Sequence, residues 1–187
     1  MPTPLATSAT LLSGSGFLTR SGLRYGMRPV RRSDEPGLRD MFLRCSADDL
    51  RLRCFGVSKT FPAAFAGRLA RLGDSREFAI LAVMDGGEIG GVVHTVGLPG
   101  AGSEADYDIM VRSDLKGQGI GMRLMRAMLS QAGQAGFSAV HGDVMMNNRA
   151  MLLLASDLGF RRVAMEAGIV RITAAPGAAE SVGAALS

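Results

Sequence analysis

A turn built on three alternating glycines, Gly117, Gly119 and Gly121, constrains the fold of this chain more than any other feature. It follows the strand-like segment EADYDIMV and opens GMRLMRAMLSQAGQAG, in which apolar residues recur at helical spacing. A helix that starts directly after a strand leaves unpaired backbone N–H groups and its positive dipole end at one point. Glycines let an anion approach that backbone, and Lys116 adds a positive charge beside it. The segment therefore predicts a phosphate-binding turn.

Two other phosphate-binding turns do not fit this segment. A P-loop closes its glycines with Lys-Ser or Lys-Thr, whereas Met122 and Arg123 follow Gly121 here. A dinucleotide-binding turn needs G-x-G-x-x-G early in a strand–helix–strand unit, with an acid about twenty residues onward. Here the glycines come late, after a hairpin, and their spacing differs. The remaining alternative is a turn that only starts a helix and binds nothing.

The rest of the chain predicts one mixed α/β (α+β) domain. Strand patterns cover residues 23–30, 76–85, 89–98, 104–111, 137–145 and, as a final hairpin, 161–173. Helical patterns cover 33–45, 46–55, 61–72, 121–136 and 147–160. Residues 1–22 and 175–187 are poor in large apolar groups, so we expect flexible segments on either side of a domain at 23–174.

Composition narrows the possible partners. The formal net charge of +4 suits a phosphorylated ligand but is too small to indicate nucleic acid. Cys45 and Cys54 have no paired spacing and only two histidines accompany them, so we expect neither a disulfide nor a metal site. No secretory signal and no apolar run long enough for a bilayer is present. We therefore expect a cytoplasmic protein that binds neither nucleic acid nor membrane.

The glycine turn resembles that of the GNAT acetyltransferases, whose pattern is Arg or Gln, two residues, Gly, one residue, then Gly or Ala. Lys116, Gly119 and Gly121 occupy those places, and Lys116 departs from the usual residue. The order of elements between residues 23 and 173 is also that of the GNAT fold. More narrowly, LKGQGIGMRLM and NNRAMLLLASDLGF are similar to the GNAT domain of bacterial Pat-type protein lysine acetyltransferases.

The resemblance implies a fold and a cosubstrate, acetyl-CoA. The fold is a mixed, mostly antiparallel sheet of six to seven strands with about four helices, whose fourth and fifth strands splay apart around the thioester. Backbone amides at Met110 and Val111 would polarise the thioester carbonyl. Asn148 would cap its helix or bind the pantetheine arm. The diphosphate would lie at Lys116, Gly117, Gln118, Gly119, Ile120 and Gly121.

The resemblance also implies transfer to a lysine side chain of another protein by direct attack. Pat-type enzymes carry a glutamate on the fourth strand, and Asp106 fills that position here. Asp106 is therefore the candidate general base. It would act through a water, because the lysine pKa lies about six units above that of a carboxylate. The structural alternative is a solvated acid beside Glu104 and Asp108, which share its strand face. Many relatives carry a tyrosine where this chain has Ala155, so the thiolate would take its proton elsewhere.

Other interpretations stay open. The three acids could form the wall of a site for a small amine, and a non-catalytic acyl-CoA sensor would also need the glycine turn. His94 and His141 lie in apolar strand segments typical of core histidines. Arg51 and Arg53 are possible acceptor contacts on a helix whose arginines would otherwise be solvated. The expected assembly is a monomer or a homodimer.

Overall fold

The computed structural model describes residues 16–54, 61–72 and 76–176, which form one sheet of eight strands. The strands are β1 (Phe17–Leu18), β2 (Arg24–Pro29), β3 (Glu77–Met84), β4 (Ile89–Gly97), β5 (Glu104–Val111), β6 (Ala139–Met145), β7 (Arg161–Glu166) and β8 (Ile169–Ala174). Their spatial order is β1-β2-β3-β4-β5-β6-β8-β7. Among the described strands, β5 and β6 form the only parallel pair.

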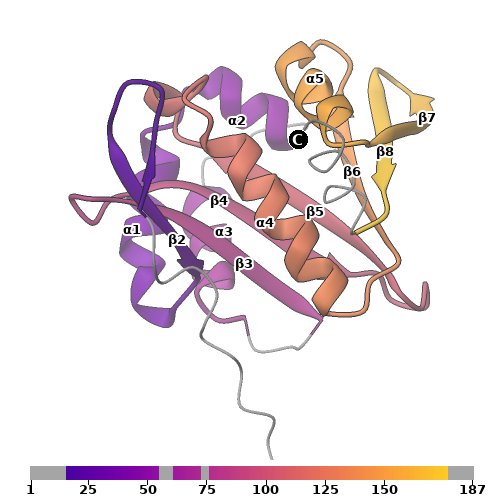
Figure 1. The fold of residues 1–187 in the computed structure, drawn as a ribbon, viewed down its shortest axis with the longest axis horizontal. Helices are drawn as coiled ribbons and strands as arrows, with labels where there is room; N and C mark the ends of the chain where they lie inside the picture. Colours follow the sequence, from indigo (N-terminus) through magenta and orange to yellow (C-terminus); the bar gives the residue numbers. More distant parts are fainter. Residues whose placement is uncertain (1–15, 55–60, 73–75, 177–187) are drawn as a thin grey trace, which may run out of the picture.

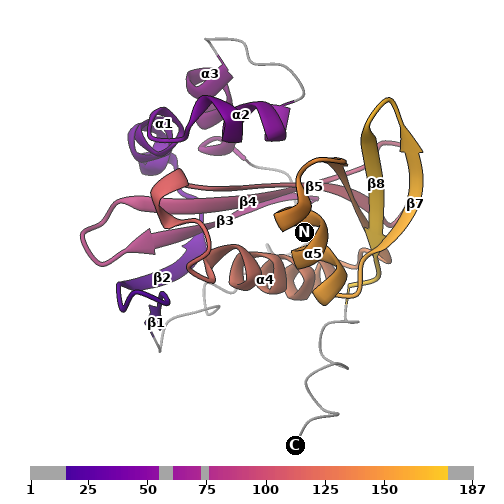
Figure 2. The same cartoon turned by 90° about the horizontal axis from the view of Figure 1, so that it is seen from above.

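Helices cover both faces of this sheet, as Figures 1 and 2 show. One face carries α1 (Glu35–Leu43), α2 (Ala47–Cys54) and α3 (Phe61–Leu69), and the other carries α4 (Ile120–Gln134) and α5 (Arg149–Asp157). Short 3-10 turns, η1 (Arg32–Asp34) and η2 (Ser113–Leu115), precede α1 and the glycine turn.

Strand alternation divides the interior into two hydrophobic cores. On β3, Ala79 and Leu81 pack with α1 and α3, whereas Ile80 and Ala82 pack with α4. All four side chains are buried, because a central strand covered on both faces has no solvated side. The mixed, mostly antiparallel sheet with helices on both faces confirms the predicted fold class.

The parallel pair β5–β6 separates soon after it begins. Paired residues run only from Glu104 with Ala139 to Asp106 with His141. Beyond that point β5 continues along β4 to Val111, while β6 continues along β8. These are the fourth and fifth strands of the sequence prediction, because β1 adds one to the count. The predicted splay is therefore present.

The strand β1 was not expected, and it brings the count to eight among the described residues rather than six to seven. It lies within the stretch 1–22 that we assigned to a flexible segment. The ring of Phe17 lies 5.5 Å from that of Tyr25, and the Arg123 guanidinium lies 4.6 Å from the Phe17 ring centre. Contacts with β2 and α4 order this short strand, and local sequence does not reveal them. Residues 1–15 and 177–187, also assigned to flexible segments, lie outside the described residues.

An ion pair joins β2 to the start of α1 and yields a stability prediction. Arg28 contacts both carboxylate oxygens of Asp34 at 2.7 Å, and the Arg31 N–H donates to the same carboxylate at 2.7 Å. Burial alone would raise the pKa of Asp34, but these hydrogen bonds and the charges of Arg28 and Arg31 lower it.

We expect Asp34→Asn to lower the free energy of unfolding at neutral pH by about 1–3 kcal/mol, because it leaves Arg28 without its buried anion. The pKa of Asp34 is lower in the folded protein than in the unfolded chain, so its carboxylate stabilises the fold fully at pH values above the unfolded pKa. This stabilisation is lost as the pH falls through the folded-state pKa. Urea unfolding at pH 7 and pH 3 measures the free energy of unfolding of wild type and of Asp34→Asn. A difference between wild type and Asp34→Asn that stays constant with pH would contradict this.

Two absences concern the described residues alone. No helix there has the length and apolar character needed to span a membrane. No three His, Cys, Asp or Glu side chains gather there to hold a metal ion.

The thiol of Cys45 is buried, and this burial together with the charge of Asp49 raises the pKa of the thiol to about 11. The Cys54 side chain lies outside the described residues.

Candidate active site

A cavity of about 550 Å³ extends from the glycine turn into the gap between β5 and β6. Side chains and backbone of β5, β6, α4 and α5 line it, together with Arg20 and parts of α2. Of the residues that the sequence singled out, those lining the cavity are Met110, Val111, Lys116, Gly117, Gly119, Ile120, Gly121 and Asn148. Gln118 and Asp106 are not among its lining residues. Eight of the ten predicted site residues therefore line one cavity, and the other two, Asp106 and Gln118, adjoin lining residues in the sequence.

The glycine turn has the geometry that an anion site needs. Gly117 and Gly119 have φ values of +72° and +89°, which side chains rarely adopt, and Gly119 is the N-cap of α4. No side chain among the described residues caps this helix end, and its first turn carries no acid. The first N–H groups of α4 and its positive dipole end are therefore left for an anion.

Two cations lie at this turn. Lys116 forms an ion pair with Asp49 of α2, and Ser113 donates to the same carboxylate. Burial would raise the pKa of Asp49, but these hydrogen bonds lower it, so the carboxylate stays charged and holds α2 against the turn. Arg20, on the loop after β1, also lines the cavity. Arg20 was not expected at the site, because it lies in the stretch 1–22 that we assigned to a flexible segment.

Gln118 explains how Arg20 reaches the turn. The Ser21 N–H donates to the Gln118 side-chain oxygen at 2.9 Å, and the Arg20 N–H donates to its backbone oxygen at 3.3 Å. Gln118 therefore fastens the loop between β1 and β2 over the glycines.

The backbone of β5 presents hydrogen-bonding groups to the gap. In an antiparallel ladder, alternate residues bond to the same neighbour. The Arg112 N–H donates to Gly90 on β4 at 2.9 Å, so Met110, two residues earlier, also bonds on the β4 side. The N–H groups of Ile109 and Val111 consequently point towards the gap. Val111 thus has the orientation that an oxyanion donor needs, and Ile109 is a second donor that the sequence analysis did not single out.

Acidic groups surround the point where the strands part. Asp106 is the last β5 residue that pairs with β6, and its carboxylate lies 2.5 Å from Arg171 of β8. The other arm of Arg171 contacts Asp143 of β6 at 3.0 Å. Burial would lower the pKa of Arg171, but both carboxylates raise it, so one guanidinium joins three strands. Asp108 and Asp143 line the cavity.

The two histidines pair with carboxylates of neighbouring strands. His94 is buried, with Nε2 2.8 Å from Glu77 and Nδ1 3.9 Å from Asp108. His141 Nε2 lies 3.0 Å from Glu104. Neither histidine lines the cavity. Both positions agree with structural histidines of the sheet.

Four further positions that the sequence singled out lie on α2, on α5 or at the start of α5. Asn148 caps α5, since its side-chain oxygen accepts from the Met151 N–H at 3.2 Å, and it also lines the cavity. Ala155 is buried on α5. Arg51 is exposed and lies 3.3 Å from Asp48, as expected for a solvated helix face, and the Arg53 side chain lies outside the described residues.

Solved structures share this architecture. The GNAT domain of S. lividans PAT matches with a TM-score of 0.77 at 20% identity, covering 86% of this chain and 96% of that one. A ribosomal-protein-S5-alanine acetyltransferase from Vibrio fischeri matches with a TM-score of 0.69 at 16% identity, over 88% and 98%. A cAMP-binding acyltransferase from Mycobacterium smegmatis matches with a TM-score of 0.62 at 21% identity. That match covers 91% of this chain but only 49% of the mycobacterial protein.

At these identities the structural matches establish the fold alone. The sequence itself matches the family model described as "Acetyltransferase (GNAT) family" over residues 45–160. That range includes α2, the strands β3 to β6, the glycine turn and α5. The match spans more than half of the chain, and the protein therefore belongs to the acetyltransferase (GNAT) family.

Proposed function

We propose that this protein transfers the acetyl group of acetyl-CoA to the side-chain amine of a lysine on another protein. One observation carries the proposal: a single cavity joins an uncapped helix N-terminus to a gap between parted strands, and carboxylates lie where that gap closes. An anion site, an open strand edge and a group that can accept a proton are the parts that such a transfer needs.

The residues fit acetyl-CoA at three points. The glycine turn and the start of α4 would hold the diphosphate, with Arg20 as a nearby cation. The open edge of β5 offers N–H groups at Ile109 and Val111 to the amide-rich arm and the thioester carbonyl. Asn148, at the start of α5, also lines the cavity. When bound, acetyl-CoA supplies an activated acyl group.

Proton removal falls to Asp106 in this proposal. A lysine ammonium with an ordinary pKa near ~10.4 is a poor nucleophile at pH 7 until it loses a proton. Asp106 lies outside the cavity lining, so a water would carry the proton between amine and carboxylate. Arg171 orients Asp106 and keeps it at the point where β5 and β6 separate.

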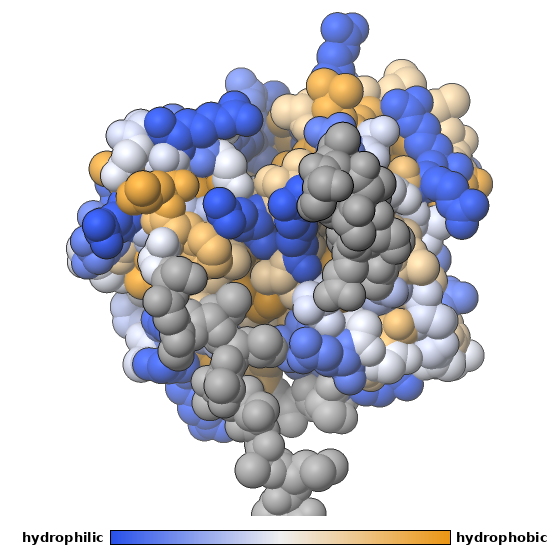
Figure 3. Space-filling model, in the orientation of Figure 1, coloured by the Kyte–Doolittle hydropathy of each residue, from blue (hydrophilic) through white to orange (hydrophobic). Residues whose placement is uncertain are grey.

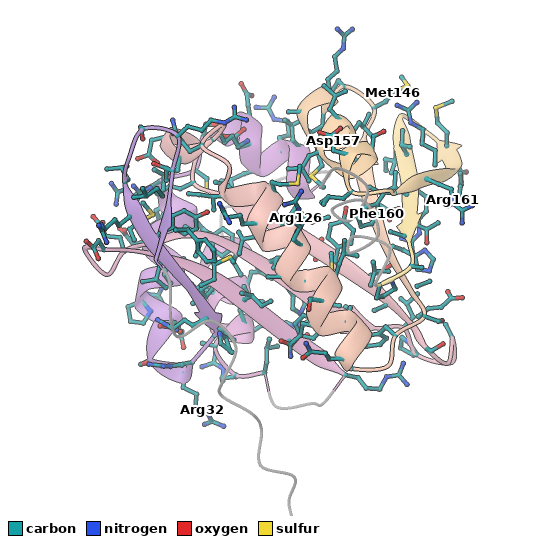
Figure 4. All side chains as sticks on the ribbon, in the orientation of Figure 1. Arg32, Arg126, Met146, Asp157, Phe160 and Arg161 are labelled. Carbon is teal, nitrogen blue, oxygen red and sulfur yellow. The ribbon has the colours of Figure 1, made fainter. Side chains whose placement is uncertain are left out.

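A lysine acceptor rests on likeness, and a small amine is the second candidate. The resemblance of LKGQGIGMRLM and NNRAMLLLASDLGF to Pat-type domains favours a protein acceptor. The acidic lining favours any cationic acceptor, because Asp108, Asp143 and Asp157 all border the cavity. Asp157 lies on α5 near the top of the view in Figure 4.

The test is to incubate the protein with radiolabelled acetyl-CoA and either a mixture of folded bacterial proteins or a panel of free polyamines, amino acids and aminoglycosides. We expect label on proteins, located at lysine Nζ by mass spectrometry and absent from free amines. The same proteins with their lysines methylated serve as the control. Label on free amines alone would support the small-amine function, and coenzyme binding without any transfer would support an acyl-CoA sensor.

A further inference from the structure

Tyr107 carries a buried hydroxyl that the mechanism above does not use. It follows Asp106 on β5 and is the first residue beyond the last pair with β6. Its side chain is only 6% exposed and points to the α4 side of the sheet. Its hydroxyl has no hydrogen-bond partner among the described residues. A buried hydroxyl without a partner costs free energy, which a ligand or an ordered water relieves.

The Tyr107 ring and hydroxyl lie over Gly142 of β6. A Cβ added at Gly142 of β6 would lie 2.9 Å from the Tyr107 oxygen and 2.6 Å from its ring, so only glycine leaves room for it there. Tyr107 and Gly142 both line the cavity. The tyrosine therefore reaches from β5 over the opposite strand at the place where the two strands part.

The same ring lies close to α5. Its centre is 5.5 Å from the ring of Phe160, whose N–H donates to the Ala155 carbonyl at 3.0 Å. Figure 4 places Phe160 beneath α5, on the face of the sheet that carries α4. Tyr107 thus places its phenol in the core beside the residues that follow α5.

We propose that the Tyr107 hydroxyl donates a hydrogen bond to the sulfur of coenzyme A and stabilises it as the thiolate leaves. The inference rests on the acyl-donor site of the proposed function and does not depend on which amine accepts the acetyl group. Burial raises the pKa of Tyr107 well above its ordinary value, so the hydroxyl stays protonated and remains a donor.

The step balances without a proton from Tyr107. The amine nitrogen bonds to the acetyl carbon, the carbon–sulfur bond breaks, and its electron pair stays on sulfur. The two protons that the ammonium loses leave through the water and Asp106. The thiolate takes up a proton from solvent after release, because the pKa of an alkyl thiol lies above neutral pH.

Tyr107→Phe tests the inference, because it removes the hydroxyl and keeps the ring against Phe160. We expect kcat to fall about 10- to 100-fold, the range for losing one hydrogen bond to a charged group. The melting temperature should not fall, since the lost hydroxyl has no hydrogen-bond partner among the described residues. Tyr25→Phe is the matched control: Tyr25 is the only other tyrosine, and its buried hydroxyl also lacks a partner among the described residues. Tyr25 does not line the cavity.

A binding measurement separates this role from a structural one. Calorimetry at several pH values up to 10 compares coenzyme A, whose thiolate fraction grows with pH, with desulfo-coenzyme A for each protein. We expect wild type and Tyr25→Phe to prefer coenzyme A, and Tyr107→Phe to lose that preference by about 10-fold or more. An unchanged preference, or an equal loss for both analogues, would overturn the inference. If neither analogue binds wild type, the acyl-donor site itself is wrong, which is a different failure.

Discussion

Replacing Asp106 with asparagine is expected to lower kcat by about 100- to 10,000-fold, the range that general acid–base groups contribute. The Kd for acetyl-CoA should stay nearly unchanged, because Asp106 does not line the cavity. Asparagine keeps the shape and can still accept a hydrogen bond from Arg171, which also keeps its contact with Asp143. The loss should therefore report proton transfer rather than a broken fold. Steady-state kinetics over a range of pH, together with calorimetry of acetyl-CoA binding, measures both quantities.

Two neighbouring acids make this prediction specific. Glu104 shares the strand face of Asp106 but pairs with His141 and lies outside the cavity lining, so Glu104→Gln should leave kcat within a few-fold of wild type. Asp108 lies two residues beyond Asp106 on that face and does line the cavity. If Asp108→Asn abolishes activity while Asp106→Asn retains it, Asp108 is the base and our assignment is wrong.

Placing a charge at the glycine turn should have the largest effect on coenzyme binding. Gly119 caps α4 at a φ of +89°, a conformation that asparagine and aspartate adopt more readily than other side chains. We expect Gly119→Asn to weaken acetyl-CoA binding about 10-fold by filling space, and Gly119→Asp to weaken it at least about 100-fold further. The aspartate places a negative charge where the diphosphate should lie. Calorimetric titration at two salt concentrations measures the difference, which should shrink as salt rises.

Relative to Gly119→Asn, Gly119→Asp should bind acetyl-CoA more weakly without being less stable. An aspartate at a helix N-cap interacts favourably with the dipole, so Gly119→Asp should unfold at no lower temperature than Gly119→Asn. Gly136, at the far end of α4 with a φ of +81°, provides the control for backbone strain. Gly136→Asn and Gly136→Asp should bind acetyl-CoA like wild type. Equal binding by the two Gly119 variants would mean that no phosphate lies there.

The surface hydropathy of the α4 face does not mark the position of the site. Hydrophilic and hydrophobic side chains alternate across it in Figure 3, and Arg126 projects from the middle of α4 in Figure 4. Among the described residues, large exposed apolar side chains include Met146 after β6, Leu153 on α5, and Val163 and Met165 on β7. The glycine turn and the parted strands, rather than any single patch, define where a ligand would lie.

Features set by neighbours in sequence were predictable. The alternation of EADYDIMV placed Asp106 and Asp108 on one face, and the spacing of the glycines placed a helix start after a strand. Both depend on backbone periods and steric limits that act over a few residues. The turn, the strands around it and part of the cavity lining could therefore be predicted from the sequence.

The contacts that shape the site join residues far apart in the chain. Arg20 reaches the glycine turn because Gln118 holds its loop, and Arg171 meets Asp106 because β8 lies beside β6. The local periodicity of the sequence does not predict either of these long-range contacts. By itself the sequence determined which segments form strands, helices and an anion-binding turn, because those choices follow from local conformation. Only the tertiary structure decided how far β5 and β6 part and which side chain crosses between them, because packing on both faces of the sheet sets that gap.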